Sequence, residues 1–275
     1  LADFDQAIVI DPKYIWAIAG RGQTYQQMGE YDKALADFDR AIVIDPKYIW
    51  AIGIRGETYR QTGEYDKALA DFDRAIDLDP QYAWPIASRG ETYRQTGEYD
   101  KALADFNRAI GINPKYTWAI AHRGETYRQM SEYDKALADF GQAIDLDPQY
   151  AWAIANRGET YRQTGEYDKA LIDFDQAIEL QPNDAWAIAS RGQVYQSMNR
   201  YNEALVAFSQ ALEIDSSLDW ALIERGETYQ LMGAYAQALA DLDKAIDLNL
   251  NHAWPIAGRG ETYRLMGEYA KALND

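Results

Sequence analysis

The chain has 275 residues, 47% hydrophobic and 26% charged, a balance that predicts a folded rather than a disordered protein. Its 44 acidic residues outnumber the 27 basic ones, and the formal net charge of -17 argues against binding to nucleic acid or to anionic membranes. It has no cysteine, which excludes disulfides and thiolate metal sites. No apolar run approaches the roughly 18 residues that a membrane-spanning helix needs.

An Arg-Gly pair recurs every 34 residues, from Arg21-Gly22 to Arg259-Gly260. We number the positions of this repeat so that the glycine is position 8. All eight tryptophans then fall at position 2 and all seven phenylalanines at position 24, while the 21 tyrosines occupy positions 11, 17 and 34. No aromatic residue is left over for a site outside the repeat.

Each repeat predicts two helices, here called A and B. Helix A is expected from about position 2 to 14 and helix B from about 17 to 30, because apolar residues recur there at helical spacing. Glycine at position 15 ends helix A, and Asp-Pro near positions 31–32 ends helix B, as at Asp79-Pro80. We predict a single domain, in chain order part of a helix B at 1–14, full repeats at 15–48, 49–82, 83–116, 117–150, 151–184, 185–218 and 219–252, and a truncated repeat at 253–275.

This pattern resembles the tetratricopeptide repeat, whose period is 34 residues. The resemblance covers nearly the whole chain, with two departures, Ile at position 4 (Ile154) and Arg at position 7 (Arg157). It implies an all-α, right-handed superhelical solenoid with helix A on the concave face, a protein or peptide partner, and no cofactor. One copy carries the signature at Gly158, Tyr161, Ala170, Phe174, Ala177 and Pro182.

Positions 2, 5, 9, 12 and 13 share one face of helix A, where the resemblance places ligand contacts. We expect a nearly neutral groove that grips an extended or helical peptide, with the acidic excess on helix B at positions 18, 23 and 25. Two alternatives stay open: the tryptophans pack between repeats beside the position-34 tyrosine, and the Glu and Arg side chains only neutralise their own helix. The candidate groove residues are Trp50, Trp84, Trp118, Trp152, Trp186, Glu57, Glu91, Glu125, Glu159, Arg60, Arg94, Arg128 and Arg162.

Arginine at position 7 lies at the edge of the predicted core, where an unpaired charge would be costly. Antiparallel helices bring position 7 near position 23, which is aspartate in nearly every copy. We therefore predict structural ion pairs such as Arg55–Asp71 and Arg89–Asp105. Arg191, which faces Ala207, is an internal control.

No sequence pattern indicates an enzyme or a metal site. The two histidines, His122 and His252, belong to no recognisable triad or His-rich motif, and there is no phosphate-binding loop. The chain starts at Leu1 and shows no signal peptide, so we take it to be a fragment of a longer bacterial-type array. Its location is unassigned, with the cytoplasm favoured.

Three functions remain open: a scaffold that binds a peptide or protein in its groove, a self-assembling solenoid, and the sensor or regulatory arm of a larger signalling protein. Self-assembly rests on the two ends, which look like halves of helix B and together nearly complete a repeat. The flanking sequence would decide the third function. The candidate end-to-end contacts are Leu1, Phe4, Ile8, Tyr269 and Leu273.

Overall fold

The computed structural model describes residues 1–250 and 252–274, and over these residues it consists of helices joined by short turns, with no strand. The all-α architecture predicted from the sequence is confirmed. A helices cover positions 1–13 of a repeat and B helices positions 17–30, with α1 and α17 covering part of that range. The A helices are α2 (Ile15–Gln27), α4 (Ile49–Gln61), α6 (Ala83–Gln95), α8 (Thr117–Gln129), α10 (Ala151–Gln163), α12 (Ala185–Ser197), α14 (Asp219–Leu231) and α16 (Ala253–Leu265). The B helices are α1 (Ala2–Ile10), α3 (Tyr31–Ile44), α5 (Tyr65–Leu78), α7 (Tyr99–Ile112), α9 (Tyr133–Leu146), α11 (Tyr167–Leu180), α13 (Tyr201–Ile214), α15 (Tyr235–Leu248) and α17 (Tyr269–Ala272).

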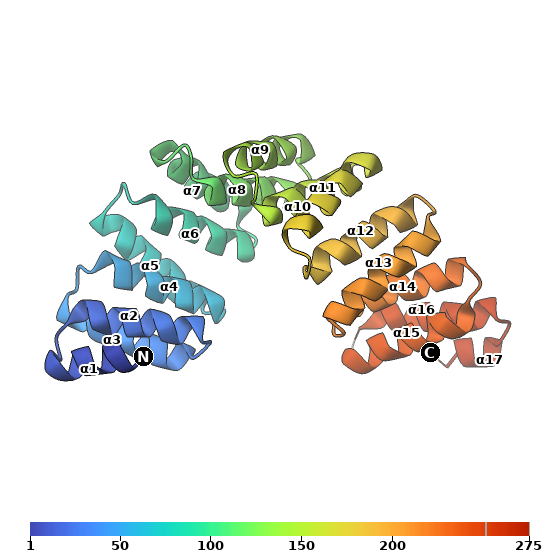
Figure 1. The fold of residues 1–275 in the computed structure, drawn as a ribbon, viewed down its shortest axis with the longest axis horizontal. Coiled ribbons are helices and arrows are strands. Elements are labelled where there is room, and N and C mark those ends of the chain that lie inside the picture. The colour runs from blue at the N-terminus through green and yellow to red at the C-terminus, as the bar shows by residue number, and fades with distance from the viewer. Residues whose placement is uncertain (251, 275) are drawn as a thin grey trace. The chain divides into compact units, whose positions relative to one another are not determined.

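The chain divides into two compact units, residues 1–146 and residues 147–275. In the first unit each A helix packs against the B helix that follows it, and each B helix packs against the next A helix (Figure 1). In the second unit α10 to α17 repeat this arrangement. Each unit is therefore a solenoid whose repeats contact their immediate neighbours. That all repeats form one continuous domain stays a prediction.

The turn from helix A to helix B explains why glycine recurs at position 15. At Gly63 the backbone has φ +78°, a left-handed conformation that costs a residue with a Cβ roughly 1–2 kcal/mol. The amide of Glu64 donates to the carbonyl of Tyr59 at 2.8 Å, which closes the helix end. Ser131 and Asn199 adopt the same conformation, with φ 60° and 58°. The turn geometry is therefore kept where the glycine is not.

The core of a repeat forms where helix A rests on the ring at position 24 of helix B. Ile52 and Phe72 are both fully buried. A Cβ built on Gly56 would lie 3.0 Å from the Phe72 ring, so a larger residue at position 8 would push the two helices apart. This close approach also brings the polar side chains at positions 7 and 23 together.

Candidate functional site

Arginine at position 7 forms a two-point bond with aspartate at position 23. Arg55 Nε donates to Asp71 Oδ2 at 2.7 Å and Nη2 donates to Asp71 Oδ1 at 2.6 Å. Arg89 and Asp105 pair in the same way, at 2.7 Å for both bonds. Asp71 is only 5% exposed. Position 23 therefore lies inside the repeat, and its charge is paired there rather than exposed on helix B.

The third nitrogen of the guanidinium makes a contact that sequence reasoning missed. Arg89 Nη1 donates at 2.6 Å to Asp73, at position 25 of the preceding repeat. The separation along the chain is 16 residues, the same as from Arg89 forward to Asp105. The aspartate 16 residues before the arginine was the feature of the sequence that could have predicted this contact. Arg21, Arg55 and Arg89 each join two consecutive B helices in this way. The hydrogen bonds that the Arg89 guanidinium donates to both aspartates raise its pKa further above its ordinary high value, against the opposing effect of burial.

Arg191 departs from this pattern because Ala207 stands where the other repeats have aspartate. Its Nη1 keeps the contact to the preceding repeat, donating to Asp175 at 2.7 Å. Its Nε is buried and finds no acceptor among the described residues. Ala207 is itself buried. One repeat therefore carries the arginine without its main counter-charge.

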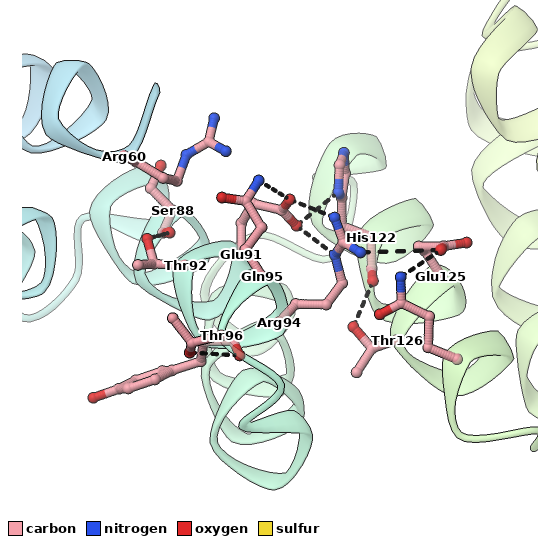
Figure 2. Close-up of polar contacts among 12 residues, drawn as sticks. Arg60, Ser88, Glu91, Thr92, Arg94, Gln95, Thr96, His122, Glu125 and Thr126 are labelled. Carbon is pink, nitrogen blue, oxygen red and sulfur yellow. Dashed lines mark hydrogen bonds and ion pairs between the residues drawn. The ribbon is translucent and has the colours of Figure 1, made fainter. Parts of the chain in front are cut away.

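Glutamate at position 9 of the A helices is more enclosed than predicted. Its spacing along helix A predicts a position in the groove, but Glu91 is only 3% exposed. Figure 2 shows it held by Arg94 through two bonds of 2.8 and 2.6 Å, by the amide of Gln95 at 2.9 Å, and by His122 Nδ1 at 3.0 Å. His122 comes from α8, so this network joins two successive repeats.

Glu91 stays ionised in this enclosed position. Burial raises the pKa of its carboxyl, but hydrogen bonds and charge from His122 and Arg94 lower it more, and the pKa falls to about 2. Burial lowers the pKa of Arg94, which its bonds to Glu91 raise above the ordinary value. At neutral pH this is an ion pair within the protein, so Glu91 has little capacity left for a partner.

The same pairing recurs at the other predicted groove carboxylates. Glu125 and Glu159 are buried and Glu57 is half-buried. Each accepts two bonds from the arginine three residues later, Arg128, Arg162 and Arg60. Within the first unit Arg94 Nη1 also comes within 4.0 Å of the carboxylate of Glu125, linking α6 to α8. From α6 to α8, negative and positive side chains therefore alternate in the order Glu91, Arg94, Glu125 and Arg128.

Repeats in the second unit carry a second polar arrangement. Gln196 replaces the arginine at position 12 and donates across to α14, to Thr228 Oγ1 at 3.1 Å and to the carbonyl of Glu224 at 3.3 Å. Gln193 replaces the glutamate at position 9 and donates to the carboxylate of Glu224 at 2.7 Å. Burial raises the pKa of Glu224. Here amide bonds between repeats take the place of ion pairs within one helix.

Tryptophan at position 2 packs between repeats and keeps part of its ring exposed. A Cβ built on Gly53 would lie 2.3 Å from the ring of Trp84, so α6 rests on α4 through this tryptophan. Trp84 also lies 6.0 Å from the ring of Tyr82 at position 34. Both contacts are those expected of inter-repeat packing. The predicted groove tryptophans Trp50, Trp84, Trp118, Trp152 and Trp186 are all half-buried.

The predicted end-to-end residues differ in their surroundings. Ile8 is buried against the first A helix, and Phe4 lies 5.9 Å from Trp16, ring to ring. Leu1 and Tyr269 are exposed, and Leu273 is 87% exposed. Association through these residues stays a prediction.

The described residues contain no group of three or more His, Cys, Asp or Glu that could hold a metal ion. In the same part of the chain, no helix is both long enough and apolar enough to cross a membrane.

Sequence models of the tetratricopeptide repeat match the chain over residues 15–48, 48–115, 150–217 and 221–252, and a further TPR repeat model matches residues 124–163. No curated protein shows a significant sequence match.

Several solved structures are similar to the chain. A tetratricopeptide repeat protein from Parabacteroides merdae is 20% identical, with a TM-score of 0.70, over 90% of this chain and 98% of that chain. The APC/C hetero-tetramer Cut9–Hcn1 gives 16% identity and a TM-score of 0.79 over 95% of this chain and 51% of that chain. These two likenesses show the fold alone. YrrB, described as a TPR protein with an unusual peptide-binding site, is 25% identical, with a TM-score of 0.52, over 67% of this chain and 95% of that chain.

Proposed function

Because the chain belongs to the tetratricopeptide repeat family, whose fold serves as a protein-interaction scaffold, we propose that it holds an extended segment of a partner protein along its A helices. The contact surface is the exposed edge of these helices, formed by tryptophan at position 2, arginine at position 12 and glutamine at position 13. On α6 this edge consists of Trp84, Arg94 and Gln95. We call it the A-helix edge.

The observation that carries the proposal is the fixed geometry of the arginines on this edge. A buried carboxylate holds Arg94 by two bonds, while the arginine side chain itself stays 15% exposed. A side chain already held in place loses less entropy when a partner binds. Arginine and tryptophan are also the residues that most often dominate binding energy at protein interfaces.

The pairing also indicates how a partner is selected. Each Glu–Arg pair cancels its own charge, so the edge of the first unit adds little to the net charge of the chain. The amides of Gln95 and Gln129 remain on the exposed side, where a backbone in extended conformation can exchange hydrogen bonds with them. We therefore expect recognition by hydrogen bonds and aromatic contact rather than by a strong charge. The peptide-binding site described for YrrB supports a peptide partner here.

Selection of random displayed peptides against the full chain tests this proposal. We expect selected peptides to bind the purified chain and to protect the amides of α6 and α8 from hydrogen exchange. Arg94→Ala should weaken binding at least tenfold. Asp100→Ala, a matched change at an exposed site on α7, should leave it unchanged. Peptides that protect only the B helices, or equal losses for both variants, would contradict the proposal.

A further inference from the structure

Positions 9 and 12 of the A helices change together along the chain, with one exception. Five A helices combine glutamate at position 9 with arginine at position 12, as in Glu91 and Arg94. Helices α2 and α12 have glutamine at both positions. Helix α14 keeps the glutamate, Glu227, but has Gln230 in place of the arginine. One helix of the A-helix edge therefore carries the carboxylate without the arginine that holds it in the other copies.

The side chain of Gln230 does not compensate for the missing arginine. Its amide donates to the carbonyl of Gly258 at 2.8 Å and to the hydroxyl of Thr262, both on α16. The donor that reaches Glu227 is the indole N–H of Trp254, 2.8 Å from Oε1. Because this donor is uncharged, it leaves the negative charge of the carboxylate in place. Among the described residues, no lysine or arginine forms an ion pair with Glu227.

A second carboxylate adds to this charge. Glu224 lies three residues before Glu227 on the same face of α14. It accepts a hydrogen bond from the amide of Gln193 at 2.7 Å, again from an uncharged donor. Burial raises the pKa of Glu224, and the charge of Glu227 raises it further, against the effect of the bond from Gln193. The two carboxylates therefore repel each other, and in the described part of the chain neither contacts a cation.

An exposed apolar side chain lies beside these carboxylates. Leu231 follows Glu227 by four residues, so it lies on the same face of the helix, and it is 61% exposed. Helix α6 has Gln95 at this position, bonded to Glu91. An arginine side chain combines a planar cation, which fits a carboxylate through two bonds, with an aliphatic stem that covers apolar surface. Helix α14 presents a partner for each of these two parts.

We propose that α14 binds an arginine of the partner segment, which takes the place of the arginine that this helix lacks at position 12. The inference rests on the proposed scaffold function and names the chemistry of the partner at one helix of the A-helix edge. The guanidinium donates two bonds to Glu227, as Arg94 does to Glu91, and Leu231 contacts its aliphatic stem. Glu224 adds negative charge beside it.

Selection of random displayed peptides against the full chain and against two variants tests this assignment. Gln230→Arg supplies the missing arginine from the protein itself, and Glu227→Gln removes the charge of the carboxylate. We expect arginine to be enriched in the peptides that the wild-type chain selects, and not in those that either variant selects. Thermal melting checks that both variants are folded. The arginine-containing peptides should protect the amides of α14 from hydrogen exchange.

Calorimetric titration with a synthetic copy of one such peptide measures the contribution of its arginine. Replacement of that arginine by glutamine should weaken binding to the wild-type chain at least about tenfold, and replacement by lysine should also weaken it, because lysine cannot form the two-point bond. Gln176→Arg is the matched control variant. It adds the same charge to α11, a B helix, at the position where α5 carries Arg74, and it should change neither the enrichment nor the affinity.

Equal arginine content in the peptides selected by wild type and by Gln230→Arg, equal binding of the glutamine analogue, or an equal loss with Gln176→Arg would each overturn the assignment. The scaffold proposal fails separately. If selected peptides protect α6 and α8 but show no preference for arginine, the assignment to α14 alone is wrong. If no selected peptide protects any A helix, both proposals are wrong.

Discussion

Residues 83–116 and residues 185–218 are copies of one repeat with the same fold but different polar contacts. The apolar framework is shared: Ile86 and Phe106 in one copy, like Ile188 and Phe208 in the other, are fully buried. The first copy pairs arginine with aspartate or glutamate inside the repeat. The second has alanine and glutamine at those positions and donates amide bonds to the following repeat.

The two copies also differ in how closely their helices pack. A Cβ built on Gly192 would lie 2.9 Å from the ring of Phe208, whereas one built on Gly90 would lie 3.4 Å from the Phe106 ring and 3.1 Å from Asp105. A Cβ built on Gly22 would also lie 2.9 Å from the Phe38 ring although Asp37 is present, so this distance varies between copies independently of the aspartate. The buried apolar residues are therefore the same in the two copies, whereas the polar residues around them and their hydrogen-bond partners differ.

Truncation of the shared ring gives the largest expected effect. Phe106→Ala and Phe208→Ala should each lower the free energy of unfolding by roughly 3–5 kcal/mol, because each leaves a cavity in a fully buried core. Urea denaturation of the two variants measures this. A decrease in the free energy of unfolding below about 1 kcal/mol in either copy would show that its polar contacts, rather than its buried ring, provide most of the stability of that repeat.

Substitutions at position 23, aspartate in one copy and alanine in the other, should have the second largest effect on the free energy of unfolding. Asp105→Ala should cost about 2–3 kcal/mol, since it leaves the half-buried guanidinium of Arg89 without its main acceptor. The reverse change, Ala207→Asp, should recover less than about 1 kcal/mol, because burial of the new carboxylate offsets much of the gain from supplying the missing acceptor to Arg191. Equal and opposite changes in unfolding free energy would refute this cost of burying the carboxylate.

Glu91→Gln places in the first copy the residue found at Gln193. We expect it to cost about 2 kcal/mol at neutral pH, because Arg94 loses its counter-charge. The pKa of Glu91 is depressed to about 2, so its charge stabilises the fold above the pKa of an unfolded glutamate, about 4.3, and that contribution disappears as the pH falls toward 2. The stability gap between wild type and variant should therefore narrow from pH 7 to pH 3. A gap that is constant with pH would contradict this reading.

The turn residues give the smallest effect. Gly97→Ala should cost about 1 kcal/mol, since Gly97 has φ +80°. Asn199→Gly should change stability by less than about 0.5 kcal/mol, because asparagine tolerates this conformation and accepts a hydrogen bond from the hydroxyl of Tyr201 at 2.7 Å. Melting temperatures of both variants test the contrast, and a large gain from Asn199→Gly would reveal strain in the second copy.

The sequence predicts the helices and the core well because a repeat can be compared with itself. Every copy presents the same ring at position 24 or an aliphatic substitute such as Leu242, so the buried stripe stands out without an alignment. Proximity of Arg55 to Asp71 followed from the antiparallel course of two helices within one repeat.

Contacts between repeats were harder to predict. A helical wheel places Glu91 on a face of its helix, but it does not show that Arg94, Gln95 and His122 enclose it. The residue at position 6 differs between copies in the sequence, but which residues it contacts depends on how far each A helix is shifted relative to the preceding one. That shift brings His122 to Glu91 and Glu224 to Gln193.

The position-7 arginine with its two aspartates, each 16 residues away, has a consequence for how such an array can change length. Among the first repeats, where Arg21, Arg55 and Arg89 each have both aspartates, removal or duplication of one 34-residue unit keeps an arginine 16 residues from an aspartate on both sides. A deletion that is not a multiple of 34 residues changes this spacing at the junction and separates the guanidinium from one of its aspartates. Recombination between identical segments such as 55–72 and 89–106 changes the chain by whole repeats and therefore preserves these ion pairs, whereas a change by part of a repeat breaks them.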